Sequence, residues 1–167
     1  MIFVTVGTHE QPFNRLVSCV DQLKDSGKLG DEEVVIQAGY STYEPRCCKF
    51  SKLIAPAEVT DLVKKARIVI THGGPSSFIL PLTYGKIPIV VPRQADFQEH
   101  VNNHQLNFCR AVAQQMKNII LVEDIDKLEG TITNYDSIVA NMNASLSSNN
   151  EKFVARLEEI VDDLMKK

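Results

Sequence analysis

The chain has 167 residues, of which 44% are hydrophobic and 23% charged, and its formal net charge at pH 7 is -3. These values are typical of one soluble globular domain spanning residues 1–167, and they argue against a disordered chain. Nucleic-acid binding is not expected, because it needs a basic face. Neither an apolar run of membrane-spanning length nor a signal peptide is found, so a cytoplasmic location is expected.

The cysteines predict neither a disulfide framework nor a zinc site. There are four of them, and none has the Cys-x-x-Cys spacing. In a chain without an export signal, reduced thiols are the usual state. The four are Cys19, Cys47, Cys48 and Cys109.

The N-terminal part of the chain predicts alternating strands and helices. Residues 2–6 are β-branched and nearly all apolar, which is typical of a central parallel strand covered on both faces. Apolar residues then recur at helical spacing from Phe13 to about Asp25, and residues 34–37 have the pattern of a second strand. Residues 42–51 resemble a surface loop and residues 52–55 a short strand. The next helix is predicted to begin at Pro56, because proline is favoured at the first helical position.

The centre of the chain combines a strand, a glycine turn and the start of a helix. Residues 68–71 are a short β-branched run, which indicates a buried strand. Gly73 and Gly74 permit a tight turn, and Pro75 opens a helix. The first turn of a helix has unpaired N–H groups and a partial positive charge, and the glycines would let an anion come close. This turn is therefore predicted to hold a diphosphate.

Proline makes the helix after the turn less regular than usual. Inside a regular helix Pro81 would cost about 3 kcal/mol, so we expect a kink near Phe78 or a helix that starts again there. Beyond it, the pattern predicts a strand at residues 87–91, a helix from beyond Phe97 to about Val112, a strand at residues 119–122, a short helix that begins at residues 124–128 and a last helix at residues 153–164.

Strands that alternate with helices predict an α/β fold, a Rossmann-like doubly wound parallel sheet. Ligands of such sheets bind outside the carboxyl ends of the strands. Four polar clusters follow predicted strands, at residues 7–11, 37–40, 71–77 and 92–100. They should therefore meet at one rim of the sheet and form a binding site.

Several motifs of the chain resemble the family 28 glycosyltransferase C-terminal domain. They are residues 4–13 (Val-Thr-Val-Gly-Thr-His-Glu-Gln-Pro-Phe), residues 72–75 (His-Gly-Gly-Pro), and residues 91–94 together with 99–101 and 104–105. The match covers nearly the whole stretch 1–112. Within the family, the chain is most similar to short bacterial subunits of exopolysaccharide and capsule assembly, including the β-1,4-galactosyltransferase type. It also resembles the soluble subunit of the two-component UDP-GlcNAc transferase.

The resemblance implies the C-terminal, donor-binding half of a GT-B glycosyltransferase. The expected reaction is an inverting transfer of a hexose, galactose in this type, from a UDP-sugar to a lipid-linked saccharide in exopolysaccharide or capsule biosynthesis. The acceptor-binding half would be a separate membrane-anchored subunit, which would hold this chain at the inner face of the plasma membrane. The UDP-sugar is the donor substrate. No cofactor and no metal ion is expected, because a helix dipole and backbone N–H groups can stabilise the departing UDP.

The family motifs imply the site residues by position. The diphosphate turn corresponds to residues 73–77 and the first loop to residues 7–9, and residues 54–58 stand where the family holds uracil. Many members carry a glutamate that grips the ribose hydroxyls, and Leu80 occupies that position here. The substrate-binding residues implied in this way are Gly7, Thr8, His72, Gly73, Gly74, Pro75, Ser76, Ser77, Arg93, Gln94, Glu99 and His100, with His9 as a candidate catalytic base.

Other interpretations of these residues remain open. His72 could cap a turn, His9 could stabilise its own loop, and Arg93 could pair with Asp96 or Glu99 on the surface. A non-catalytic regulatory or scaffold subunit with the same fold is the alternative function, and the catalytic base could come from the partner chain. A dinucleotide-dependent oxidoreductase is disfavoured, because no Gly-x-Gly-x-x-Gly motif follows the first strand.

Overall fold

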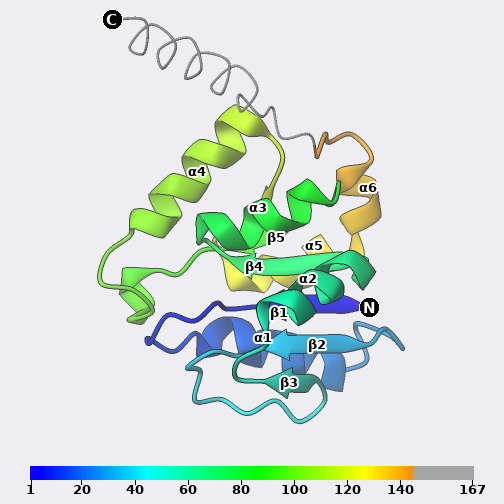
Figure 1. Cartoon of the computed structure of the whole chain (residues 1–167), viewed down its shortest axis with the longest axis vertical. Helices are drawn as coiled ribbons and strands as arrows, with labels where there is room; N and C mark the ends of the chain where they lie inside the picture. The colour runs from blue at the N-terminus through cyan, green and yellow to red at the C-terminus, as the bar shows by residue number, and fades with distance from the viewer. Residues whose placement is uncertain (145–167) are drawn as a thin grey trace, which may run out of the picture.

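The computed structural model describes residues 1–144 and shows a six-stranded sheet in which every paired strand is parallel (Figure 1). The strand order is β3-β2-β1-β4-β5-β6, so the chain starts in the middle, builds one half, and then crosses over to build the other. This is the order of a doubly wound sheet, and it confirms the predicted Rossmann-like α/β fold class. The strands are β1 (Ile2–Thr5), β2 (Val34–Gln37), β3 (Lys49–Ser51), β4 (Ile68–His72), β5 (Ile89–Val91) and β6 (Ile120–Leu121).

Helices cover both faces of the sheet. Alternate residues of each strand point to opposite sides, so each face carries apolar side chains that the helices bury. On one face, Val4 and Ile70 belong to a buried cluster that includes side chains of α1 (Asn14–Asp25), α5 (Leu128–Thr133) and α6 (Tyr135–Val139). In Figure 1, α1 lies behind the strands. Burial on both faces explains why these strands are nearly continuous apolar runs.

The opposite face carries the three helices that surround the site. Phe3 and Val69 pack with α2 (Pro56–Lys65), while Val90 lies in a cluster with α3 (Pro75–Thr83) and α4 (His104–Met116). Both α2 and α3 begin at the carboxyl edge of the sheet, each with proline at its N-terminus. Short 3-10 turns, η1 (Ala95–Phe97) and η2 (Ile125–Lys127), follow β5 and β6.

The strand register places polar residues together at the carboxyl edge. Thr5 is the partner of Gln37 in β2 and of Thr71 in β4. The Thr5 hydroxyl donates to Oε1 of Gln37 over 2.8 Å. Because the three strands end at one level, the loops that follow β1 and β4 start next to each other.

The sequence prediction is wrong at the outer strand of one half. β3 lies at Lys49–Ser51, inside the expected loop, and residues 52–55 have no strand. All residues of β3 are exposed, so this edge strand has no apolar alternation to reveal it. Its position is fixed by pairing with β2, where Lys49 lies opposite Val35.

The helix α3 runs without interruption from Pro75 to Thr83, so the expected restart near Phe78 is wrong. Pro81 lies two residues before the last residue of the helix. At that place a proline removes one late backbone hydrogen bond and does not stop the earlier turns.

The C-terminal part differs from expectation in its helix boundaries. α4 begins at His104, so Val101 precedes the helix and is 77% exposed. The unpredicted α6 is held by Tyr135, whose hydroxyl donates to the Ile87 carbonyl over 2.7 Å. The predicted last helix, residues 153–164, lies outside the described residues.

Candidate functional site

A cleft of about 690 Å³ opens at the carboxyl edge, between the N-terminal halves of α2 and α3. The strand order reverses between β1 and β4, so the cleft lies at the switch point where doubly wound sheets bind ligands. The cleft is lined by Thr5, Gly7, Thr8, His9 and Gln37 from the β1 and β2 ends, by Ile54, Pro56, Val59, Thr60 and Val63 from α2 and the segment before it, by His72, Ser76, Ser77 and Leu80 from β4 and α3, and by Gln105 from α4.

His72 ends β4, and its ring caps the glycine turn. Its Nδ1 accepts the Gly74 N–H over 3.0 Å, and its Nε2 lies 2.9 Å from the Ser77 hydroxyl oxygen. Since Nδ1 is an acceptor, the proton of the neutral ring is assigned to Nε2, which donates to Ser77. Burial, together with the charge of Arg93, lowers the pKa of His72 to about 4, so the ring is neutral at pH 7. The Ser77 hydroxyl proton is then free for a ligand.

Three glycines near this ring, Gly7, Gly73 and Gly74, leave space for the side chains of His72 and Cys109. A Cβ on Gly7 would lie 2.4 Å from Nε2 of His72, and a Cβ on Gly74 would lie 2.3 Å from Cε1. A Cβ on Gly73 would lie 2.9 Å from the sulfur of Cys109 in α4. Glycine is thus needed at Gly73 and Gly74 for packing behind the turn. Close approach of a phosphate to the same turn stays a prediction.

The first turn of α3 offers an anion fewer backbone donors than its sequence suggests. Pro75 has no N–H, and the Gly74 N–H is bonded to His72. The Ser77 N–H donates to the Gly74 carbonyl over 3.0 Å. The turn therefore presents its dipole, the Ser76 N–H and two serine hydroxyls to the cleft.

The rings of His9 and His100 lie against each other, from the loops after β1 and β5. Their ring centroids are 5.2 Å apart. Nδ1 of His9 accepts the Gln11 N–H over 3.2 Å, so the proton of the neutral ring is assigned to Nε2. An acceptor nitrogen is what a general base needs, and this geometry instead makes Nε2 a hydrogen-bond donor. The structure therefore does not support His9 as the catalytic base.

Arg93 is completely buried, with 0% of its surface exposed. Its Nη1 donates to the carbonyls of Gln11, over 2.8 Å, and Glu99, over 3.2 Å, while Nη2 donates to that of Val6 over 3.0 Å. The side chain thus ties the loop after β1 to residues 92–100. Because it is buried, it forms no surface ion pair, and its predicted contact with substrate stays a prediction. Burial lowers the pKa of His9 and of His72, and the charge of Arg93 lowers both further.

Glu99 is also buried, with 3% exposed, and its carboxylate is fully engaged. Arg15 of α1 donates to both oxygens, over 2.9 and 2.8 Å, and the Gln94 N–H donates over 3.1 Å. The Gln94 side chain donates to the Glu123 carbonyl over 2.7 Å. The carboxylate of Glu99 thus bonds protein groups in this structure, and its predicted contact with substrate stays a prediction. Arg15, which the sequence did not single out, holds this segment in place.

The apolar part of the cleft was missed as a site. Val59 and Val63 of α2 and Leu80 of α3 line this part, and none of the three was predicted to bind substrate. Gln105, a member of the quoted motifs, lines the cleft, and its Oε1 accepts the Arg93 N–H over 3.3 Å. Ile54 lines the cleft just before α2, in the segment predicted to hold uracil.

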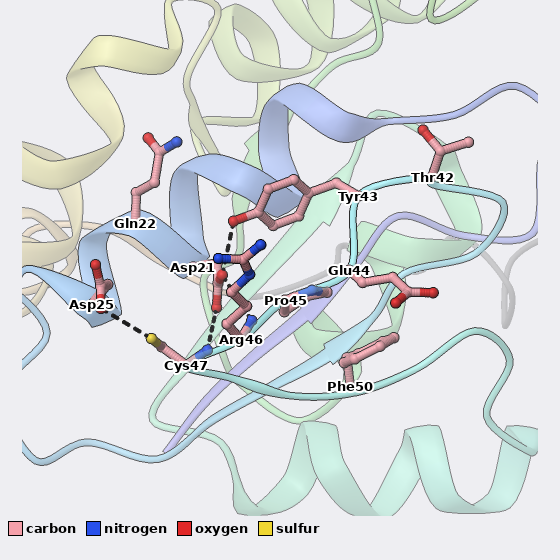
Figure 2. Close-up of a pocket in the computed structure, with 10 residues that line it drawn as sticks. All are labelled: Asp21, Gln22, Asp25, Thr42, Tyr43, Glu44, Pro45, Arg46, Cys47 and Phe50. Carbon is pink, nitrogen blue, oxygen red and sulfur yellow. Dashed lines mark hydrogen bonds between the residues drawn. The ribbon is translucent and has the colours of Figure 1, made fainter.

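A second hollow, of about 820 Å³, lies between α1 and the loop that precedes β3 (Figure 2). Asp21 holds this loop: its carboxylate accepts hydrogen bonds from the Tyr43 hydroxyl and the Arg46 N–H, both over 2.9 Å, and from the Cys47 N–H over 2.8 Å. Every polar contact of this buried carboxylate therefore serves the loop itself. None of the predicted site residues lines this hollow.

Among residues 1–144 no cluster of three or more His, Cys, Asp or Glu is arranged to hold a metal ion. The Asp-x-Asp triplet at residues 124–126 lies at η2, where the Asp124 carboxylate accepts the Asp126 N–H. It lines neither hollow. No helix in the same stretch is both long and apolar enough to span a membrane.

A doubly wound α/β domain with a cleft at its switch point is an architecture that binds ligands at this place. The model of the glycosyltransferase family 28 C-terminal domain matches residues 1–164, and the chain belongs to this family.

The chain is similar to a human protein and to one solved structure. The UDP-N-acetylglucosamine transferase subunit ALG13 of Homo sapiens is 29% identical over 122 residues, which are 68% of this chain and 10% of that protein. The chain therefore spans about a tenth of the length of this relative. The glycosyltransferase SnogD from Streptomyces nogalater is similar over 84% of this chain and 40% of its own, with 17% identity and a TM-score of 0.46.

Proposed function

We propose that this chain is the donor-binding, catalytic subunit of a two-component glycosyltransferase. It takes a UDP-sugar as donor and transfers its hexose, galactose in the first instance, to a lipid-linked saccharide. The observation that supports this most is the cleft at the switch point, with the first turn of α3 on one wall. Family membership and the name of the human relative support a UDP-sugar donor.

The lining suggests how the donor lies. Uracil fits the segment from Ile54 to the start of α2, and the ribose lies between α2 and Leu80. The diphosphate then reaches the first turn of α3, where the hydroxyls of Ser76 and Ser77 and the helix dipole face it. These groups and Nε2–H of His9 stabilise the charge that develops on departing UDP. No metal ion is required in this scheme.

A partner completes the proposed enzyme. Transfer needs a base that deprotonates the acceptor hydroxyl, and the geometry of His9 argues against that residue. We assign the base and the acceptor site to a membrane-anchored partner subunit, which places this chain in the cytoplasm at the inner face of the plasma membrane. Exopolysaccharide or capsule biosynthesis is the pathway proposed.

A non-catalytic scaffold subunit is the second candidate. It is favoured by Leu80, which presents an apolar surface where the family places a ribose-binding glutamate. It is also favoured by Arg93 and Glu99, which are buried and make hydrogen bonds inside the protein.

Calorimetric titration with UDP-galactose, UDP-GlcNAc and UDP-glucose, with and without the co-expressed partner, separates the two candidates. The enzyme should give a saturable heat and transfer sugar to membranes. A Thr60→Trp variant, which fills the cleft from α2, should abolish both. A matched Gln22→Trp variant, which fills the other hollow from α1, should leave them unchanged. Absence of heat and transfer for all donors with the partner present would establish the scaffold.

A further inference from the structure

His9 and His100 form a pair of hydrogen-bond donors beside the cleft. Nδ1 of His9 accepts the Gln11 N–H over 3.2 Å, and Nδ1 of His100 accepts the Asn102 N–H over 3.4 Å. In both neutral rings the proton is therefore assigned to Nε2. His9 lines the cleft, while His100 packs against it at 5.2 Å between ring centroids.

The charges around this pair include one buried cation, Arg93, that makes no ion pair with a carboxylate of residues 1–144. Glu99 is engaged by Arg15, and the guanidinium of Arg93 is bonded to backbone carbonyls. Arg93 therefore remains a buried cation next to the histidines, where charges are weakly screened. A UDP-sugar brings one negative charge on each phosphate, so Arg93 balances one phosphate and leaves the other unbalanced.

We propose that the His9–His100 pair takes up one proton when the diphosphate of a nucleotide sugar enters the cleft. The added positive charge then balances the charge of the second phosphate. The inference rests on the proposed function, because it takes the UDP-sugar as its ligand. His9 is the ring that touches the phosphate, through its Nε2–H. The new proton enters at Nδ1 of His9, which then gives up the hydrogen bond from the Gln11 N–H. His100 is a positioning residue, because its ring packs against that of His9.

The free protein is prepared for this uptake. Burial lowers the pKa of His9, Arg93 and His100 lower it further, and Glu10 on the same loop opposes them. The neighbouring His72 is neutral at pH 7, because its pKa is about 4. His9 is thus mostly neutral in the empty cleft near pH 7, and an adjacent anion favours its charged form.

The sign of the pH dependence follows from linkage. The ligand raises the pKa of His9, so the complex binds more protons than the free protein and affinity rises as pH falls. The gain in affinity is complete below the pKa of His9 in the free protein, and it is lost above the pKa of His9 in the complex. Between them, affinity changes by up to about tenfold per pH unit and binding takes up as much as about one proton.

The test measures protons directly. UDP-galactose and UDP-GlcNAc are suitable probes, because their phosphates are diesters that do not titrate near neutral pH. Calorimetry at pH 7 in two buffers of different ionisation heat gives the uptake, and ring NMR follows the four histidines with and without the probe. We expect proton uptake, a rise in the pKa of His9 on binding, and binding of uridine alone without uptake.

Single substitutions identify the groups responsible. His9→Gln should abolish the uptake and flatten the pH dependence of the Kd, and His100→Gln should reduce the uptake and raise the pKa of His9 in the free protein. His104→Gln, at the exposed start of α4, should change neither. Binding without uptake, or uptake that survives His9→Gln, would overturn the inference and leave the proposed function standing. Failure of every donor to bind, with the partner present, would overturn both the inference and the proposed function. The NMR titration uses the wild-type protein, so it does not depend on whether a variant folds.

Discussion

At the scale of residues, the polar side chains nearest the cleft mostly organise the backbone. Arg93 binds carbonyls of the loop after β1, and Glu99 binds Arg15 of α1. The family motifs implied that both side chains bind substrate. Sequence alone could not separate the two roles, because Arg15 lies 84 positions away from Glu99 and only the tertiary fold brings them together.

Replacement of Gly74 by alanine tests the packing of His72. The new Cβ would lie 2.3 Å from Cε1 of the ring, so the ring or the turn has to move. We expect a loss of about 1–3 kcal/mol in the free energy of unfolding, which is the usual cost of overpacking, and weaker donor binding. Urea denaturation and donor titration measure the two effects.

Gly130→Ala is the matched control for this substitution. Gly130 lies in α5, and a Cβ there meets no atom within 4 Å. Alanine should stabilise the protein by about 0.4–1 kcal/mol, because it restricts the unfolded chain. Equal stability of both alanine variants and the wild type would show that the ring of His72 does not occupy the space between the glycines.

Glu99→Gln tests the buried ion pair. The pair is 2.8 Å long, and the side chains of Arg15 and Glu99 are only 12% and 4% exposed. Removal of one charge leaves the other buried without a partner, so we expect the free energy of unfolding to fall by about 3 kcal/mol or more. Denaturation of Glu99→Gln, Arg15→Met and the double variant gives the coupling energy.

Glu33→Gln provides the comparison for the buried pair. Glu33 pairs with Lys49, but the two side chains are 49% and 77% exposed. Solvent screens such a pair, and no measurable loss of stability is expected. If Glu99→Gln were as harmless as Glu33→Gln, the segment from Pro92 to Asn103 would not depend on Arg15.

At the scale of elements, the buried strands were predicted and the exposed edge was not. β1, β2, β4 and β5 are apolar on both faces, and such runs have few alternatives to a covered parallel sheet. β3 is exposed throughout, and its register comes from β2 and from the loop that Asp21 anchors. Tertiary contacts of this kind leave no local pattern in the sequence.

Asp21→Asn tests the anchor of that loop and predicts a pH effect. Burial tends to raise the pKa of Asp21, but hydrogen bonds from Arg46, Cys47 and Tyr43 outweigh it, so the pKa lies below its usual value. The ionised form thus stabilises the fold above about pH 4, the ordinary aspartate pKa, and the benefit is lost as pH falls through the folded value.

In the asparagine variant, an amide group faces N–H donors, so stability at pH 7 should fall by about 1–3 kcal/mol. Its stability should also decline less steeply than that of the wild type in acid. Denaturation midpoints between pH 2 and pH 7 measure both. Asp61→Asn, on the exposed surface of α2, should match the wild type to within about 0.5 kcal/mol. An acid limb of unchanged slope in Asp21→Asn would contradict the assignment.

At the scale of the whole molecule, the topology decided more about the site than any motif did. The alternation of strands and helices predicted the sheet, and the sheet predicted that loops after β1, β2 and β4 meet. The apolar wall of Val59, Val63 and Leu80 was not predicted, because helical spacing cannot tell a core face from the wall of a cleft. That distinction depends on the gap between α2 and α3.

A bound UDP-sugar should change amide hydrogen exchange at the cleft between α2 and α3 and leave it unchanged at the hollow beside α1. The Ser76 amide lies in the first turn of α3, where helical N–H groups lack an intrahelical acceptor. Thr8 is an exposed residue of the loop after β1, and both residues line the cleft. Binding in this cleft should slow their exchange strongly. The amides of Arg46 and Cys47 already donate to Asp21 beside the other hollow, so their local exchange should not change.

Peptide-level exchange with and without UDP-galactose, at short labelling times, makes the comparison within one sample. A bound donor also raises the free energy of global unfolding, by about 2.7 kcal/mol at a ligand concentration of 100 Kd, but this stabilisation affects only the slowest amides. Protection at residues 42–47, with none at residues 8 and 76, would move the ligand to the hollow beside α1. It would also remove the cleft between α2 and α3 as the support for donor binding.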